Sequence, residues 1–153
     1  LVSNNMGAKR VDRVRESLFT ALKYGYSIAF FGVIILYFSA HWIIAHFDKD
    51  PDVIAYAYAY ISVMMLLFFG YVTHFVCVAT LQGIKHPRMI FYIGAFRQLL
   101  APIIIYMLIV KVWQLSFVWM WIGLACIVYS SAIVILGYTL NILKTIDDTQ
   151  RYS

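Results

Sequence analysis

The chain has 153 residues, of which 63% are hydrophobic and only 12% are charged, and its formal net charge is +5. Soluble domains usually carry about a quarter charged residues, so this composition excludes an ordinary water-soluble domain and predicts a protein solvated by lipid. The basic residues gather at the ends of apolar stretches. We therefore interpret the positive charge as membrane topology and expect no nucleic-acid partner.

The first segment, residues 1–23, is basic and has an apolar face. Its apolar residues Val11, Val14, Leu18 and Leu22 recur at helical spacing. We expect an amphipathic helix that lies at the cytoplasmic membrane surface before the chain enters the bilayer. The polar stretch at the start of the chain has the character of a mid-protein segment, which predicts a C-terminal fragment of a longer membrane protein.

Four long apolar stretches follow, and the chain then ends in a polar tail. A helix rises about 1.5 Å per residue, so about 20 apolar residues cross the ~30 Å hydrocarbon core of a bilayer. The second stretch has no charged residue between Asp52 and Lys85, and the third has a single charge, Arg97. The sequence therefore predicts an all-α membrane protein with four transmembrane helices, at residues 24–47, 53–84, 89–110 and 112–143, and a cytoplasmic tail at 144–153. Pro102 should kink the third helix because proline removes a backbone donor.

The basic residues of the connecting segments fall mostly on one side of the membrane. If the chain crosses four times, the opposite side has only Lys49 and Lys111, together with three aspartates. Because short cytoplasmic loops are enriched in Lys and Arg, we expect a multi-pass protein of the cell membrane with both ends of this chain in the cytoplasm. The cytoplasmic side would then have these basic residues: Lys9, Arg10, Arg13, Arg15, Lys23, Lys85, Arg88, Lys144 and Arg151.

Small residues within the spans predict where the helices touch. Membrane helices approach closely where side chains are small, so we expect antiparallel neighbours with small residues at their contacts. The residues expected at these contacts are Gly70, Gly94, Ala95, Gly123 and Gly137.

Polar residues inside the spans are the candidate functional residues, because an ionisable group in lipid is costly unless it is paired or hydrated. Arg97, with Gln98 beside it, could bind an anionic group or a carboxylate of a neighbouring helix, or it could be a structural arginine near the cytoplasmic interface. His74 could relay a proton, or it could be a hydrogen-bonded packing residue. We take Arg97, Gln98, His74 and Pro102 as candidates for contact with a substrate or cavity.

Several kinds of chemistry have no support in the sequence. There is no nucleophile–base set, no phosphate-binding glycine loop and no cluster of metal ligands, so we expect neither an enzyme nor a bound cofactor or metal. Cys77 and Cys126 lie within spans and are interpreted as packing residues. No span contains Asp or Glu. If this chain belongs to a cation-coupled carrier, its coupling carboxylate must lie in another part of the protein.

Four short motifs in order resemble the C-terminal third of the multidrug and toxic compound extrusion (MATE) family. Asn5-Met6-Gly7-Ala8-Lys9 followed by Arg13 is similar to the family's Q-N-x-G-A signature, and the turn from Phe47 to Val53 is similar to F-x-x-D-P-E-V. Leu81-Gln82-Gly83 with Pro87-Arg88 is similar to the connector L-Q-G-x-G-x-P-R. Arg97-Gln98 with Pro102 and Tyr106 resembles R-Q-x(n)-P-L-x-Y of the eleventh helix. The resemblance spans roughly residues 3 to 143 and is vaguest across the fourth span.

The resemblance implies a twelve-helix antiporter built of two six-helix lobes, of which this chain would be the last four helices. Such carriers export cationic or amphipathic organic compounds, drugs among them, in exchange for protons or sodium ions. The partners would be small organic cations, membrane lipid and the remaining helices of the transporter. Some members have an acidic residue in the tenth helix, and this chain has none there, which favours the DinF-like branch.

Two other interpretations remain open at the level of sequence. A related flippase for a lipid-linked glycan would use the same fold, but it would need a more cationic cavity, and Arg97 is the one cation within these spans. An autonomous four-span structural protein is the other alternative.

Overall fold

The computed structural model describes residues 1–114 and 116–151, and these residues form helices with no strand. Two connected helices open the chain, α1 (Val2–Gly7) and α2 (Val11–Phe47), and α3 (Pro51–Gly83) follows. The third span consists of four consecutive segments, α4 (Arg88–Ala95), η1 (Phe96–Leu100), α5 (Ala101–Tyr106) and η2 (Met107–Val112). The last helix is α6 (Phe117–Arg151).

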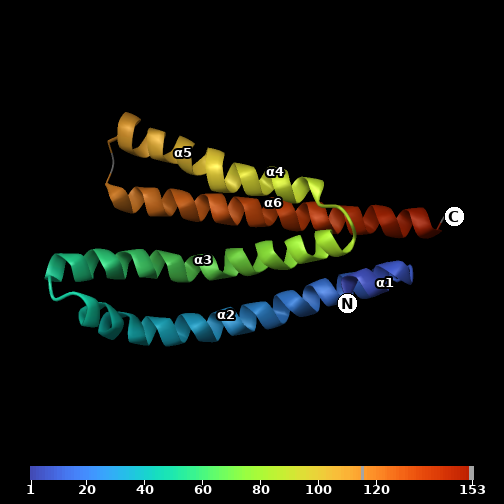
Figure 1. The fold of residues 1–153 in the computed structure, drawn as a ribbon, viewed down its shortest axis with the longest axis horizontal. Coiled ribbons are helices and arrows are strands. Elements are labelled where there is room, and N and C mark those ends of the chain that lie inside the picture. Colours follow the sequence, from blue (N-terminus) through green and yellow to red (C-terminus); the bar gives the residue numbers. More distant parts are fainter. Residues whose placement is uncertain (115, 152–153) are drawn as a thin grey trace.

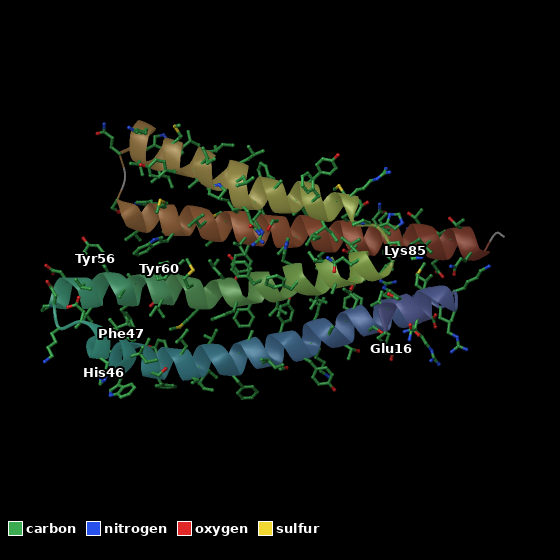
Figure 2. All side chains as sticks on the ribbon, in the orientation of Figure 1. Glu16, His46, Phe47, Tyr56, Tyr60 and Lys85 are labelled. Carbon is green, nitrogen blue, oxygen red and sulfur yellow. The ribbon has the colours of Figure 1, made fainter. Side chains whose placement is uncertain are left out.

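The helices run antiparallel and side by side (Figure 1). In the described part of the chain, four helical stretches are long and apolar enough to cross a membrane, which confirms the predicted all-α, four-span fold. α3 packs between α2 and α6, and α6 packs between α3 and the third span. The turn from α2 to α3 lies at the end of the bundle opposite the turn from α3 to α4, so His46 and Lys85 lie far apart (Figure 2).

The apolar face of the first segment is buried by protein. α2 runs for 37 residues without interruption, so no break in the helix separates residues 11–23 from the predicted span. Val14 and Leu18 are almost fully buried and belong to one core cluster with Leu81 of α3 and Ile135 of α6. This core lies at the end of the bundle that contains the basic connectors, and it fixes α2, α3 and α6 against one another.

The turn between α2 and α3 is held by its acidic residues. The Asp50 carboxylate accepts a hydrogen bond of 2.9 Å from the backbone N–H of Asp52, and Pro51 occupies the first position of α3. Both features suit a helix start, because an aspartate satisfies a free N–H there and proline has none to satisfy. Asp48 accepts a similar bond of 3.0 Å from the Asp50 N–H.

The turn between α3 and α4 has a backbone conformation that favours glycine. Lys85 has a φ of 61°, and the His86 N–H donates to the Leu81 carbonyl over 2.9 Å, which closes the end of α3. In the L-Q-G-x-G-x-P-R pattern the second glycine falls on Lys85. The backbone at this position is left-handed, which explains why the family pattern has glycine there. Only glycine adopts this conformation at no steric cost.

Two of the predicted glycine contacts are present. A Cβ added to Gly70 would lie 2.8 Å from Cγ1 of Val128, so α3 and α6 approach closely at this point. A Cβ added to Gly123 would lie 2.7 Å from Cγ2 of Ile105, so α6 and α5 do the same. These glycines are at helix contacts because no larger residue fits.

The expectation was wrong for two other glycines, and it missed glycines that do lie at close contacts, Gly25 among them. Gly94 and Gly137 face open space, with no atom within 4 Å of an added Cβ. Gly25, which the sequence analysis did not single out, lies against Val72, whose Cγ1 would be 2.6 Å from an added Cβ. Small size alone therefore does not identify a helix contact in this chain.

Candidate functional site

The third span changes its hydrogen-bonding pattern around Pro102. The Ala101 N–H donates to the Phe96 carbonyl, five residues back, so η1 forms a widened π-helical turn. Pro102 has no N–H to donate to the Gln98 carbonyl, four residues back, which interrupts the regular α-helical ladder at the same place. The predicted irregularity at Pro102 thus takes the form of a π-helical turn, and such turns inside α-helices are frequent at functional sites.

Arg97 lies in this widened turn and is buried against α3. Its side chain is only 9% exposed, and its Cζ lies 5.3 Å from the ring centroid of Tyr71. A guanidinium over an aromatic face is attracted by the ring electrons, which offsets part of the cost of burial. The Nε of Arg97 nevertheless has no hydrogen-bond partner among the residues that the structure describes.

A cavity of about 250 Å³ opens beside Arg97, between α3, η1, α5 and α6. Its polar groups come from Arg97, Gln98 and Tyr71, and its remaining wall is mostly aliphatic. The lining residues are Met64, Leu67, Tyr71, Arg97, Gln98, Pro102, Leu124, Ile127 and Val128. The structure thus brings three of the four candidate residues, Arg97, Gln98 and Pro102, to one cavity. Their contact with a substrate stays a prediction.

His74 is buried near this cavity without lining it. Its side chain is 5% exposed, its Nδ1 has no hydrogen-bond partner among the described residues, and it interacts electrostatically with Arg97. His74 follows Tyr71 by three residues, so the two share a face of α3. Within the part of the chain that the structure describes, His74 therefore lacks a hydrogen bond that a purely structural histidine would need.

Hydrogen bonds between helices fix the position of α3, on which Tyr71 and His74 lie. The Tyr26 hydroxyl of α2 and the Thr73 hydroxyl of α3 are 2.6 Å apart. A second bond comes from α6, whose Tyr129 hydroxyl donates to the Leu66 carbonyl of α3. One bond joins α3 to α2 and the other joins it to α6, so the face of α3 that meets Arg97 has a defined orientation.

Sequence reasoning missed Tyr71 and the cavity wall supplied by α6. Tyr71 could have been found from its helical spacing to His74, since polar residues three apart lie on one helix face. Leu124, Ile127 and Val128 gave no such signal, because apolar residues inside a span face lipid and protein alike. In the described residues, no group of three or more His, Cys, Asp or Glu side chains could hold a metal ion. Cys77 is buried and Cys126 is exposed, and neither forms a disulfide.

Comparison with known families completes this description. The family model named MatE matches residues 1–108, which is more than half of the chain and includes all four candidate residues. The chain belongs to the MatE family. Searches among curated proteins and among solved structures returned no match. Members of this family are membrane transporters for small organic compounds rather than enzymes, so the resemblance drawn from the motifs is confirmed at the level of the family, whereas the DinF-like branch stays a prediction.

Proposed function

We propose that this chain forms the last four helices of a twelve-helix antiporter that exports cationic or amphipathic organic compounds in exchange for protons or sodium ions. The family assignment and the order of the four motifs support this proposal. We further propose that both ends of the chain face the cytoplasm. The basic connector at Lys85 and the acidic turn at Asp48–Asp52 lie at opposite ends of the bundle, as this topology requires (Figure 2).

The observation that carries the proposal is the interrupted third span with its cavity. A carrier needs polar groups inside the membrane that contact its cargo, and it needs helices that are able to change shape. η1 and Pro102 supply an irregular segment, and Arg97 and Gln98 bring polar groups to the cavity beside it. The four spans contain no carboxylate, so the group that exchanges protons or sodium would come from another part of the transporter. We expect no transport from these four helices alone.

The test is transport by the intact gene product in everted membrane vesicles. We expect accumulation of an amphipathic cationic dye, such as ethidium, when a proton or sodium gradient is imposed. Arg97→Ala should slow this accumulation by at least about tenfold, the factor that corresponds to about 1.4 kcal/mol of lost stabilisation. Accumulation that ignores both gradients would refute the antiporter.

The matched control is His41→Ala, in the first span. His41 is exposed on α2, a helix that contributes no residue to the cavity lining, so its removal should leave dye accumulation unchanged. Equal, wild-type rates in both variants would remove Arg97 from the transport mechanism. Detergent-solubilised protein from each variant should elute as a single peak at the wild-type volume, which separates loss of transport from loss of folding.

A further inference from the structure

The positive charge of Arg97 has no carboxylate partner among the residues that the structure describes. The sequence contains no Asp or Glu between Asp52 and Asp147, and the helices that form the cavity have carboxylates only at their ends. A buried charge that lacks a partner is strongly unfavourable, because the interior does not replace the water that the charge has lost. The face of Tyr71 compensates for only part of this loss, and Nε remains without a partner among the described residues.

The cavity beside Arg97 has the size and the wall of a binding site for a small molecule with one charged end. Its volume is about 250 Å³, with Arg97 and Gln98 as the hydrogen-bond donors and with aliphatic side chains such as Leu67 and Leu124 opposite them. A guanidinium presents two parallel N–H groups that match the two oxygens of a carboxylate. The aliphatic wall would cover an apolar body attached to that carboxylate.

We propose that Arg97 and Gln98 bind the carboxylate of a small organic anion, whose apolar body lies against Leu67, Leu124 and Val128. The bound anion neutralises Arg97 within the membrane. It also provides the negative charge that a cationic cargo needs and that these four spans lack. This inference depends on the proposed function in one respect, namely that the cavity belongs to a carrier. Binding is measured without any gradient, so a failure of binding and a failure of transport are distinguishable.

The probe is 4-fluorobenzoate, observed by ¹⁹F NMR with the intact protein in nanodiscs of phosphatidylcholine, and empty nanodiscs give the background. We expect the wild-type protein to broaden the ¹⁹F signal. Arg97→Gln should weaken binding by at least about tenfold, because it removes the charge and the paired donors. Arg88→Gln, which removes an exposed arginine at the start of the same span, should bind like the wild type.

A second variant keeps Arg97 and fills the cavity. Leu124→Trp leaves the charge in place and should also weaken binding by about tenfold or more, because the larger ring occupies the space of the apolar body. Equal binding by the wild type, Arg97→Gln and Leu124→Trp would overturn the proposal, as would an unbroadened signal with the wild type. Loss of the broadening when phosphatidylglycerol is added to the nanodiscs would overturn it too, because a lipid phosphate would then occupy the site.

Discussion

The third span and the other three helices of this bundle are built in different ways. α2, α3 and α6 are continuous α-helices of 37, 33 and 35 residues. The third span is divided into α4, η1, α5 and η2, and both π-helical segments have hydrogen bonds that reach five residues back. Its polar residues Arg97 and Gln98 lie in the first of these segments.

The continuous helices form most of the core, whereas the interrupted span contributes the buried charge of the candidate site. The continuous helices bury the apolar core at the basic end, where Val14, Leu81 and Ile135 are almost fully covered. The interrupted span adds one residue to that core cluster, Ile93, and places its one buried charge at the cavity. The buried charge of the third span therefore lies where the helix departs from regular α-helical hydrogen bonding. A membrane protein tolerates such irregular backbone where it is covered by protein or lines a cavity.

The largest effect is expected from Pro102→Ala, which would make the third span resemble the other three. An alanine donates an N–H to the Gln98 carbonyl, so the folded state should gain about 2 kcal/mol while dye efflux by the intact transporter falls. Thermal unfolding in detergent and transport in vesicles measure the two effects. A variant that is less stable than the wild type and transports normally would contradict the proposal that the interruption at Pro102 serves transport at a cost in stability.

A smaller effect is expected from the contact between the continuous helices α3 and α6. Gly70→Ala places a methyl group 2.8 Å from Val128 and should destabilise the protein by about 1–2 kcal/mol. The matched control, Gly137→Ala, adds the same methyl group in open space and should stabilise α6 by about 0.5–1 kcal/mol. Thermal unfolding of both variants in one detergent gives the comparison. If both variants shifted the unfolding temperature in the same direction, the close approach at Gly70 would be absent.

The smallest effect is expected at the turn that joins the two kinds of helix. Lys85→Gly relieves a left-handed residue with a φ of 61° and should stabilise the protein by about 0.5–1 kcal/mol. The control is Lys23→Gly, at an exposed position within α2. It should destabilise the protein, because glycine disfavours a regular helix. A destabilising Lys85→Gly would mean that the side chain, rather than the backbone, holds this turn.

The number and direction of the helices could be predicted from the sequence, because long uncharged stretches admit few other structures in a membrane. The burial of Val11 and Leu22 by protein could not, since an apolar face is equally suited to lipid and to a neighbouring helix. For the same reason Gly70 and Gly137 look alike in sequence, yet one is at a contact and the other is open.

The candidate site was predictable in part. Arg97 and Pro102 were evident as the charge and the proline of the third span, and they meet at one cavity. A proline predicts where the hydrogen-bonding ladder is interrupted but not which turn replaces the lost bond, so the π-helical form of η1 was not foreseen. Tyr71 was missed because an aromatic residue in a span more often anchors or packs than faces a cation.

The central claim is that the irregular turn at η1 places Gln98 at a cavity within the third span, where a soluble reagent can reach it. The most direct test is labelling of Gln98→Cys by a membrane-impermeant thiol reagent, after replacement of Cys77 and Cys126 by alanine. Leu99→Cys, on the next residue and away from the cavity lining, is the control. The account predicts rapid labelling of position 98 and none of position 99. Equal protection of both positions would contradict it.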